Sequence, residues 1–406
     1  MKALIINSVC GVGSTGKICQ ELYWKLKKTG WECKVAWGRK NGSDIPENDL
    51  IRIGTCVDYY IHAAMARIFD CTGFMSVIAT KKLIKKIVDY DPDIIHIHNL
   101  HGYYINIKIL FNYLRKNKKK VVWTMHDCWG ITGHCAHFDY CKCNKWTSIC
   151  FGCEQKKQYP KSFLLDQSKY NYIKKREIFT SIIDNLTIVT PSYWLKGKIL
   201  KSYFHSVKDV IVIHNGININ IFKLQNKCEL DQLREQYQLN GKKIILGVAY
   251  SWSDRKGVKD FKYLASKLSN THWKIVLIGI TQDEKKQMPE SILCINKTNS
   301  AVELAKWYAL AEVFVNPTYE EVLGLTNLEA QACGTSCITY NTGGCPECMI
   351  EDCGNVIVEK GNQEQLLSEI KKFQKKSPST VANNFKNYYD NSFAEKYIDV
   401  YNKAIK

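Results

Sequence analysis

Two glutamates in the second half of the chain have the type and spacing that could bind the hydroxyl groups of a sugar. Glu321 and Glu329 are separated by seven residues and follow an apolar run at 313–318, which indicates a buried strand. Gly324 lies between them and would let a phosphate approach the backbone at the start of the next helix. Thr326 and Glu329 also match a capping box, in which Glu329 would only satisfy backbone amides. That alternative leaves Glu321 and Gly324 unexplained.

A pair of cations, Arg255 and Lys256, follows another apolar run at 242–249 and precedes a helix predicted to begin near Val258. Cations at a helix N-terminus oppose the helix dipole, at a cost of a few tenths to ~1 kcal/mol each. A bound anion would reverse that cost. Arginine can bind a diphosphate through two N–H groups, and lysine adds a point charge. A solvated basic loop is the alternative interpretation.

A glycine-rich turn at 11–17, GVGSTGK, follows the first predicted strand. The first amides of the following helix attract anions, so Gly13 and Ser14 are candidates to bind a phosphate or a sugar. The turn nearly matches the nucleotide P-loop pattern, but Ile18 stands where the Mg-binding hydroxyl belongs. A P-loop nucleotide hydrolase is therefore the rival enzyme class. A tight turn with an incidental lysine is the third interpretation.

Apolar runs rich in β-formers alternate with helical stretches, which predicts parallel sheets covered by helices on both faces. The predicted strands are 2–8, 31–37, 93–98, 120–125, 186–190 and 209–214 in the first half, and 242–249, 273–280, 291–296, 313–318, 335–340 and 355–359 in the second. Such sheets bind ligands at the carboxyl ends of their strands. His126 ends one predicted strand and is a candidate at that edge. A structural pair with Asp127 is the alternative.

Two sets of about six strands predict two doubly wound Rossmann-like domains, with a ligand site in the cleft between them. The Gly- and Asn-rich stretch at 214–227 marks the boundary. We expect an N-terminal domain at 1–213 and a C-terminal domain at 214–385. The segment from about Phe385 carries aromatic residues at helical spacing, and we expect 386–406 to return to the N-terminal domain as helices.

Eighteen cysteines is a high number for a chain without an export signal. Most of the scattered ones are expected to be small buried apolar residues. Six crowd between Cys128 and Cys153, where the chain lacks strand or helix periodicity. Cys150 and Cys153 have the spacing of half a zinc knuckle, which Cys135 with Cys143 or Cys141 could complete. A structural zinc on Cys135, Cys143, Cys150 and Cys153 is one hypothesis, and reduced unpaired thiols are the other.

The 57 basic and 39 acidic residues give a net charge of +18, which predicts an anionic partner. Basic runs at 81–86 and 115–120 lie in the N-terminal half, and association with an anionic membrane surface would use them. Nucleic-acid binding shares the charge but lacks a recognised module. A non-catalytic basic binding module, stapled by zinc, is a third class of function. Because no apolar run reaches the length of a spanning helix, we expect a cytoplasmic protein.

These motifs together resemble a known family. Residues 321–335 with GGCPE at 343–347 resemble the E-x7-E signature of family 4 glycosyltransferases, which are retaining GT-B enzymes that use nucleotide-sugar donors. The resemblance spans nearly the whole chain, through GSTGK at 13–17, HIHN at 96–99, HGYY at 101–104, TMHD at 124–127, TPS at 190–192, HNGI at 214–217 and RKG at 255–257. WTMHDCW at 123–129, TGHC at 132–135 and the later cysteines resemble the bacterial exopolysaccharide (colanic-acid-type) branch.

The resemblance implies roles at the donor sugar and its nucleotide. Glu329 would hold the ribose, while Glu321 and His126 would act at the transferred sugar as the catalytic residues. The diphosphate would contact the cations and the loop amides, which are Arg255, Lys256, Gly13, Ser14, Gly324 and Leu325. Many relatives carry an arginine just after the strand before the Lys-Gly pair. This sequence has Val248-Ala249-Tyr250-Ser251 there, which leaves Arg255 as the substitute.

The resemblance also implies the chemistry. In the front-face route, the departing phosphate oxygen takes the proton of the acceptor, so no side-chain nucleophile and no metal or other cofactor is expected at the active site. The expected partners are a nucleotide-sugar donor and a glycan or undecaprenyl-diphosphate-linked acceptor. We predict a transferase that builds a surface polysaccharide.

Overall fold

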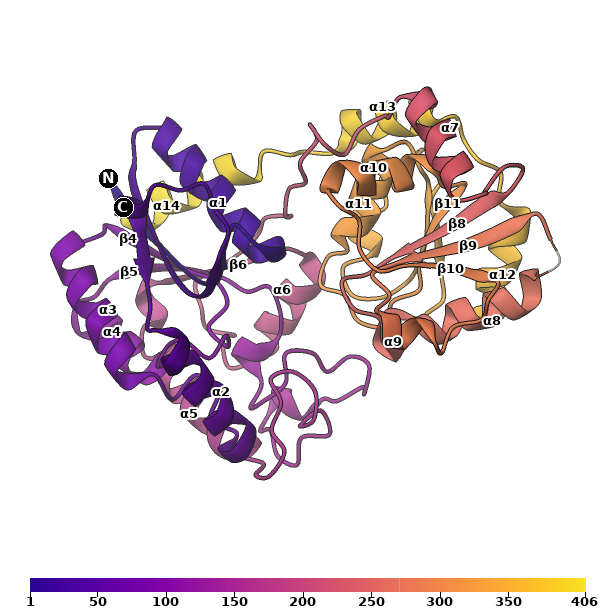
Figure 1. The fold of residues 1–406 in the computed structure, drawn as a ribbon. Helices are drawn as coiled ribbons and strands as arrows, with labels where there is room; N and C mark the ends of the chain where they lie inside the picture. The colour runs from indigo at the N-terminus through magenta and orange to yellow at the C-terminus, as the bar shows by residue number, and fades with distance from the viewer. Residues whose placement is uncertain (270) are drawn as a thin grey trace. The chain divides into compact units, whose positions relative to one another are not determined.

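The computed structural model describes residues 1–269 and 271–406, which form two α/β units (Figure 1). The first unit contains Met1–Asn215 and Ser392–Lys406, and the second contains Gly216–Asn391. The sequence had placed these boundaries at 213 and 385. The second boundary differs because Tyr389 packs against the core of the second unit, and the segment 386–391 belongs to that unit.

The first unit is built on a seven-stranded parallel sheet with the order β3-β2-β1-β4-β5-β6-β7. The six predicted strands are all present, and the added one, β3, has only three residues and therefore little sequence pattern. The strands are β1 (Lys2–Cys10), β2 (Glu32–Asn41), β3 (Leu50–Arg52), β4 (Ile94–Ile97), β5 (Lys120–Thr124), β6 (Leu186–Thr190) and β7 (Asp209–Val212).

Helices of the first unit cover this sheet. They are α1 (Gly13–Lys28), α2 (Cys56–Phe69), α3 (Val77–Tyr90), α4 (Ile107–Lys116), α5 (Ser168–Thr180), α6 (Tyr193–Leu200) and α14 (Phe393–Ile405), with the short 3-10 segments η1 (Glu47–Asp49), η2 (Trp129–Ile131), η3 (Lys145–Thr147) and η4 (Ile183–Asn185). Of the helices that the structure describes, none is long and apolar enough to cross a bilayer.

The second unit is built on a six-stranded parallel sheet with the order β10-β9-β8-β11-β12-β13. Its strands are β8 (Lys243–Val248), β9 (Trp273–Ile278), β10 (Ile292–Ile295), β11 (Val313–Asn316), β12 (Cys337–Tyr340) and β13 (Val356–Val358). Its helices are α7 (Lys227–Gln236), α8 (Val258–Leu268), α9 (Gln282–Lys285), α10 (Ala301–Leu310), α11 (Leu325–Ala332), α12 (Gln363–Lys372) and α13 (Pro378–Tyr388), with η5 (Asp254–Lys256) and η6 (Pro346–Cys348). All six predicted strands are present.

The strand order reverses at β8, which lies between β9 and β11. In an open parallel sheet, this reversal separates the loops at the carboxyl edge and creates room for a ligand. The loops that follow β8, β11 and β12 leave the sheet from three adjacent strands. The two predicted cations, the two predicted glutamates and the segment at 343–347 lie on these loops or directly after them.

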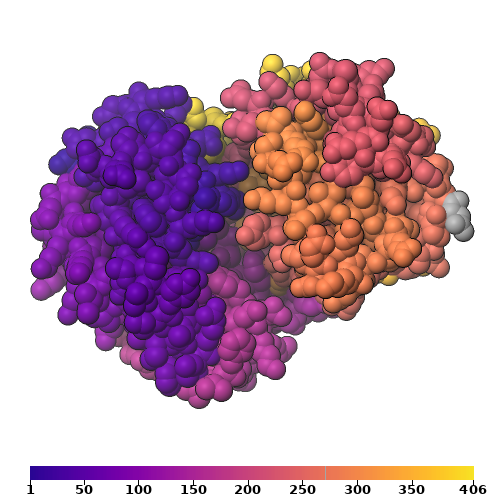
Figure 2. Space-filling view, in the orientation of Figure 1, coloured from indigo at the N-terminus to yellow at the C-terminus, as the bar shows by residue number. Residues whose placement is uncertain are grey.

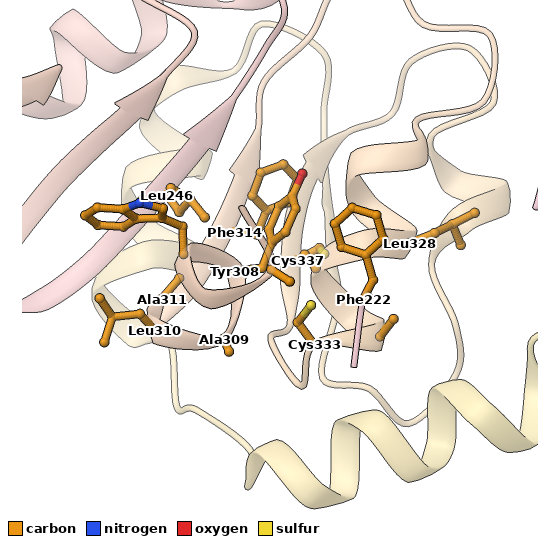
Figure 3. Packing of buried hydrophobic residues seen from close by; sticks show 14 of the residues in the cluster. Phe222, Leu246, Tyr308, Ala309, Leu310, Ala311, Phe314, Leu328, Cys333 and Cys337 are labelled. Atoms are coloured by element: carbon orange, nitrogen blue, oxygen red, sulfur yellow. The ribbon is translucent and has the colours of Figure 1, made fainter. Parts of the chain in front are cut away.

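The core of the second unit lies beneath that edge (Figure 3). The fully buried Tyr308 ring packs 5.3 Å from the ring of Phe314 and 6.1 Å from that of Phe222. Cys333 and Cys337 belong to the same cluster. Eight of the twelve cysteines outside the 128–153 segment are buried, as expected for small apolar side chains.

The C-terminal helix α14 completes the core of the first unit. Tyr397 and Tyr401 are fully buried there. The Tyr401 hydroxyl lies 2.5 Å from His96 Nδ1 of β4, and the Tyr397 hydroxyl lies 2.9 Å from Thr124 Oγ1 of β5. The helix therefore seals the central strands through both apolar packing and hydrogen bonds.

Removal of one of these rings tests the packing. We expect Tyr401→Ala to destabilise the first unit by about 3–5 kcal/mol because it leaves a cavity, and Tyr401→Phe to cost about 1 kcal/mol through the lost hydrogen bond. Urea unfolding of the full chain measures both changes. Tyr388→Ala, at an exposed position of α13, is the control. An unchanged unfolding midpoint for Tyr401→Ala would show that α14 does not contribute to this core.

Candidate active site

The turn after β8 is fixed against the loop after β11. The Tyr319 amide donates a hydrogen bond of 2.8 Å to the Arg255 carbonyl. Gly257 has a φ of 78°, and a Cβ there would lie 2.3 Å from the carbonyl oxygen of Pro317. Because only glycine allows this approach, the sequence Arg-Lys-Gly holds its two cations beside the end of β11.

The loop after β12 packs against the same segment. The Gly344 amide donates a hydrogen bond of 3.2 Å to the carbonyl of Glu321. A Cβ at Gly343, which has a φ of 57°, would lie only 1.7 Å from that carbonyl oxygen. Three loops from three adjacent strands thus meet around the backbone of Glu321.

Lys256 and Glu321 form an ion pair at this meeting point. The distance from Lys256 Nζ to Glu321 Oε2 is 2.6 Å, and the two side chains are only 22% and 26% exposed. Arg255 Nε lies 3.8 Å from Oε2 of Glu320, whose side chain is 4% exposed. The alternative of a solvated basic loop is therefore wrong, because both cations are held against carboxylates.

Glu329 lies at the same edge on α11. Its Oε2 accepts a hydrogen bond of 2.9 Å from the Tyr308 hydroxyl. Burial, together with the nearby Glu329 charge, raises the pKa of Tyr308 well above its usual value. Helix α11 begins at Leu325 after Gly324, so Glu329 is its fifth residue. The capping-box alternative is wrong, because a box with Thr326 needs Glu329 at the third helical position.

Gly324 and Leu325 supply the first turn of α11. Gly324 has a φ of 89° and is the N-cap residue. The first amides of a helix have no intrahelical partner, and they bear a partial positive charge. This helix start lies between Glu321 and Glu329 in the chain, so an anion bound there would be close to both carboxylates.

In the first unit, Gly13 and Ser14 open α1 and are both exposed. The helix already includes Gly16 and Lys17, and the Gly11 amide donates to the Gly16 carbonyl at 2.9 Å. The residues of the near P-loop match therefore lie mostly inside a helix and do not form a long phosphate-cradling loop. This geometry disfavours the P-loop hydrolase.

His126 directly follows β5 and contacts a second imidazole. Its Nε2 lies 2.8 Å from His98 Nδ1, and both rings line a cavity of about 10 Å³. Among the described residues, His98 Nε2 is buried without a hydrogen-bond partner. Burial lowers the pKa of His126 to about 4, against the opposing effect of the Asp127 charge. His126 is therefore a neutral imidazole at physiological pH.

Asp127 does form a His–Asp pair, but with a different histidine from the one expected. Its Oδ2 lies 2.7 Å from His101 Nε2, and its Oδ1 accepts from the Trp129 amide at 2.8 Å. Although burial raises its pKa, His101 outweighs that effect and holds the pKa of Asp127 at about 2. Thus the alternative pairing of His126 with Asp127 is wrong, and the His126 ring contacts His98.

The four cysteines of the zinc hypothesis line a single cavity of about 20 Å³ in the first unit. They are Cys135, Cys143, Cys150 and Cys153. A hydrogen bond from the Cys135 thiol lowers the pKa of Cys153 to about 7 despite its burial. Across residues 1–269 and 271–406, however, no three His, Cys, Asp or Glu side chains are arranged to hold a metal ion. The zinc site stays a prediction from the spacing.

Three residues that support this edge were not predicted as members of the site. Tyr308 and Glu320 anchor Glu329 and Arg255, and neither has a sequence signal of its own. Asp260 is fully buried in α8 and accepts hydrogen bonds from Tyr340 at 2.6 Å and Tyr319 at 3.1 Å. The sequence could have indicated that Asp260 is buried, because this acid lies on the same face of α8 as the apolar Phe261 and Leu264.

The fold and the comparisons together define a two-domain α/β protein of the GT-B class. Residues 15–221, about half of the chain, match the profile of Glycosyltransferase Family 4, and residues 230–391 match that of Glycosyl transferases group 1. The chain belongs to Glycosyltransferase Family 4. The family predicted from the motifs is confirmed.

Individual relatives are similar over parts of their length. The chain is 28% identical over 242 residues to the capsular polysaccharide biosynthesis glycosyltransferase CapM of Staphylococcus aureus, covering 54% of this chain and 62% of CapM. It is 32% identical over 97 residues to the putative colanic acid biosynthesis glycosyl transferase WcaC of Escherichia coli K12, covering 23% of each. These matches therefore span less than two thirds of either relative. Anabaena Alr3699/HepE, solved in complex with UDP and glucose, has the same fold with a TM-score of 0.65, 12% identity and coverage of 99% and 100%.

The buried imidazoles predict that the folded state becomes less stable at acidic pH. His62 and His126 have pKa values lowered to about 4 by burial, whereas an unfolded histidine titrates near ~6.5. Between these values the unfolded state binds more protons, so stability falls as pH falls. From pH 7 to pH 5 we expect each of these two histidines to lower the free energy of unfolding by about 2 kcal/mol.

Urea unfolding at the two pH values measures the drop, and NMR titration of the ring protons assigns it. His205→Gln, at a partly buried position, is the matched control. A His126 ring that titrates near its ordinary value would contradict the assignment.

Proposed function

We propose that this chain is a retaining glycosyltransferase that moves a sugar from a nucleoside-diphosphate donor to a glycan or a lipid-linked acceptor, in the synthesis of a surface polysaccharide. The observation that carries the proposal is the grouping of Lys256, Glu321 and the start of α11 at the carboxyl edge of one sheet. Names of relatives that make capsule and colanic acid support the same class of product.

The charges of the second unit suit a nucleoside diphosphate as leaving group. When the bond between the anomeric carbon and the phosphate oxygen breaks, negative charge grows on the β-phosphate. Lys256, Arg255 and the amides of Gly324 and Leu325 would stabilise it. The ion pair with Glu321 already fixes the Lys256 ammonium, so little reorganisation is needed when the donor binds. With two cations at this position, we propose that no metal ion is required.

Retention follows if the acceptor attacks on the face that the phosphate leaves. The acceptor oxygen then bonds to the anomeric carbon, and its proton passes to the departing phosphate oxygen. The enzyme needs no nucleophile in this route. Glu329 would hold the ribose hydroxyls, and Glu321 the hydroxyls of the transferred sugar. We propose that the reaction takes place in the cytoplasm.

His126 suits a binding role and not a proton donor. With a pKa of about 4 it carries no charge at pH 7. A neutral imidazole can accept or donate one hydrogen bond to a sugar hydroxyl. Gly13 and Ser14, at the start of α1, would add backbone amides to the donor phosphate or the acceptor.

Substitutions at the donor site test the proposal. We expect Lys256→Ala and Glu329→Gln to lower kcat/KM for sugar transfer by about 10²–10³, because each removes a charge that contacts the donor. Lys259→Ala is the matched control, since this lysine is exposed and pairs with Asp254 one turn away. Unfolding curves should be unchanged. Wild-type transfer by either site variant would refute the assignment.

A thermal-shift panel with UDP-, GDP- and ADP-sugars and with Mg-ATP, each with and without EDTA, tests the donor class. A ligand that binds the folded state stabilises it by RT ln(1 + [L]/Kd). We expect one nucleotide sugar to raise the Tm, with the rise unaffected by EDTA. A rise with Mg-ATP alone would favour the nucleotide hydrolase and overturn the proposal.

We further propose that Cys135, Cys143, Cys150 and Cys153 bind one structural zinc, supported by their spacing and by the cavity that all four line. Elemental analysis of the purified full chain should give about one zinc per chain, and Cys153→Ser should lose it. Cys228→Ser, at an exposed position in α7, is the control. Metal-free protein with eighteen titratable thiols would overturn this proposal.

A further inference from the structure

Asp260 is a buried acid that the proposed chemistry does not use. It is the third residue of α8, and the turn that carries Arg255 and Lys256 ends directly before this helix. The residue is 0% exposed, so it lies beneath the surface of the second unit that Figure 2 draws, and no ligand in solution contacts it. A carboxylate buried in this way needs hydrogen-bond donors. Here the donors come from three other elements of the second unit.

One oxygen of this carboxylate accepts three hydrogen bonds. Asp260 Oδ1 accepts from the Tyr340 hydroxyl at 2.6 Å, from the Tyr319 hydroxyl at 3.1 Å and from Gln363 Nε2 at 3.1 Å. Tyr319 lies in the loop after β11, and Tyr340 ends β12. Gln363 begins α12, which packs beside α8 (Figure 1). Asp260 therefore joins α8 to the loop after β11 and to the point where the loop after β12 begins.

The two tyrosine rings are packed closely around the carboxylate. The rings of Tyr319 and Tyr340 meet edge to face, with 5.5 Å between their centroids. A Cβ at Gly361 would lie 3.3 Å from Cε1 of Tyr319, so the chain before α12 covers that ring. Because close packing leaves a side chain little freedom, the hydrogen bond of the Tyr319 hydroxyl also fixes the position of its backbone.

The backbone of Tyr319 connects this network to the cations of the candidate site. Its amide donates to the Arg255 carbonyl at 2.8 Å. Two residues later in the same loop, Glu321 Oε2 lies 2.6 Å from Lys256 Nζ. Tyr319 thus contacts the turn before α8 through its amide and α8 itself through its hydroxyl. Two contacts between the same two segments fix their relative orientation, which a single contact leaves free to rotate.

We propose that Asp260 is a positioning residue for the diphosphate of the donor. Through Tyr319 and Tyr340 it holds the loops after β11 and β12 against α8, so that Arg255 and Lys256 are fixed where the β-phosphate binds. The inference rests on the proposed donor class. A residue that only stabilises the fold affects the affinity for related ligands alike. Asp260 instead affects the share of the affinity that the β-phosphate supplies, because that share depends on exact placement of the cations.

Calorimetric binding of nucleotides to the full chain tests the proposal. The probes are UDP with UMP, GDP with GMP, and ADP with AMP, and the comparison uses the pair that the wild-type chain binds. We expect Asp260→Leu to weaken binding of the diphosphate by about tenfold or more and binding of the monophosphate by less than about threefold. Leucine has a similar size but accepts no hydrogen bond.

Milder variants keep the test decisive if Asp260→Leu does not fold. Tyr319→Phe combined with Tyr340→Phe removes two of the donors and keeps both rings, and it should show the same selective loss of diphosphate affinity. Across the described part of the chain, Asp260 Oδ2 is buried without a hydrogen-bond partner. Asp260→Asn, which keeps a carbonyl oxygen in the place of Oδ1, should therefore bind the diphosphate within about threefold of wild type. Ser336→Ala is the matched control, because it removes a buried hydrogen bond of 2.6 Å to the Cys353 carbonyl just before β12.

A double-mutant cycle with Lys256→Ala separates positioning from an independent effect. Residues that act through one another give losses that do not add. If Asp260 acts through the cations, adding Asp260→Leu to Lys256→Ala should weaken diphosphate binding by less than about threefold beyond the single Lys256→Ala change. The double tyrosine variant serves the same cycle.

Three results would overturn the proposal. The first is unchanged diphosphate affinity in the folded variants of Asp260 or of the two tyrosines. The second is an equal loss for monophosphate and diphosphate, which would assign Asp260 to the stability of the unit alone. The third is a cycle in which the losses add in full. A wild-type chain that binds none of the three diphosphates would instead refute the proposed donor class, and this inference would fall with it.

Discussion

The hydrogen bond between the Tyr319 amide and the Arg255 carbonyl fixes the arrangement on which the candidate site depends. Parallel strands deliver their loops to one edge, but the edge alone does not bring loop residues into contact. This bond joins the loop after β8 to the loop after β11, and the contact of Gly343 with the Glu321 carbonyl joins the loop after β12. Lys256 Nζ then lies 2.6 Å from Glu321 Oε2. The site is thereby ordered by backbone contacts, which a side chain at Gly257 or Gly343 would disrupt.

The two units hold charge in different ways. The site of the second unit pairs Arg255 and Lys256 with the carboxylates of Glu320 and Glu321. In the first unit burial keeps His96, His98 and His126 neutral, and the ionised Asp127 is paired with His101. The second unit thus offers fixed charge for a phosphate, whereas the first offers hydrogen bonds suited to uncharged hydroxyl groups.

The sequence was sufficient for the strands and the edge but not for the partners of the site residues. Apolar runs predicted every strand except β3, which is too short to show alternation. The sequence also placed Gly324 at the start of a helix, where the structure has it as the N-cap residue of α11 with a φ of 89°. The Asp127 partner could not be predicted, since His126 is adjacent in sequence whereas His101 is 26 residues away, and only tertiary packing selects His101. The sequence likewise could not predict the contact of Tyr308 with Glu329, because the Tyr308 hydroxyl donates a hydrogen bond to Glu329 from a different helix.

The C-terminal boundary was misplaced for a related reason. Tyr389 and Tyr397 are both aromatic and both were expected to return to the first unit, but Tyr389 packs against the core of the second unit and Tyr397 lies in that of the first. Which core an aromatic residue enters depends on the neighbours that the fold supplies. For α13 these are residues such as Cys353, whose thiol donates to the Val381 carbonyl at 3.4 Å.

The return of α14 to the first unit makes the second unit an insertion within the first. The chain leaves the first unit after Asn215 and re-enters it at Ser392. During synthesis, therefore, the ribosome releases all of the second unit before Tyr397 and Tyr401 are available to cover β4 and β5. Domains generally fold as units while the chain emerges, so the second unit can complete its core first. The first unit is translated earlier, but His96 and Thr124 stay uncovered until α14 has been synthesised. Its core is therefore complete only after that delay.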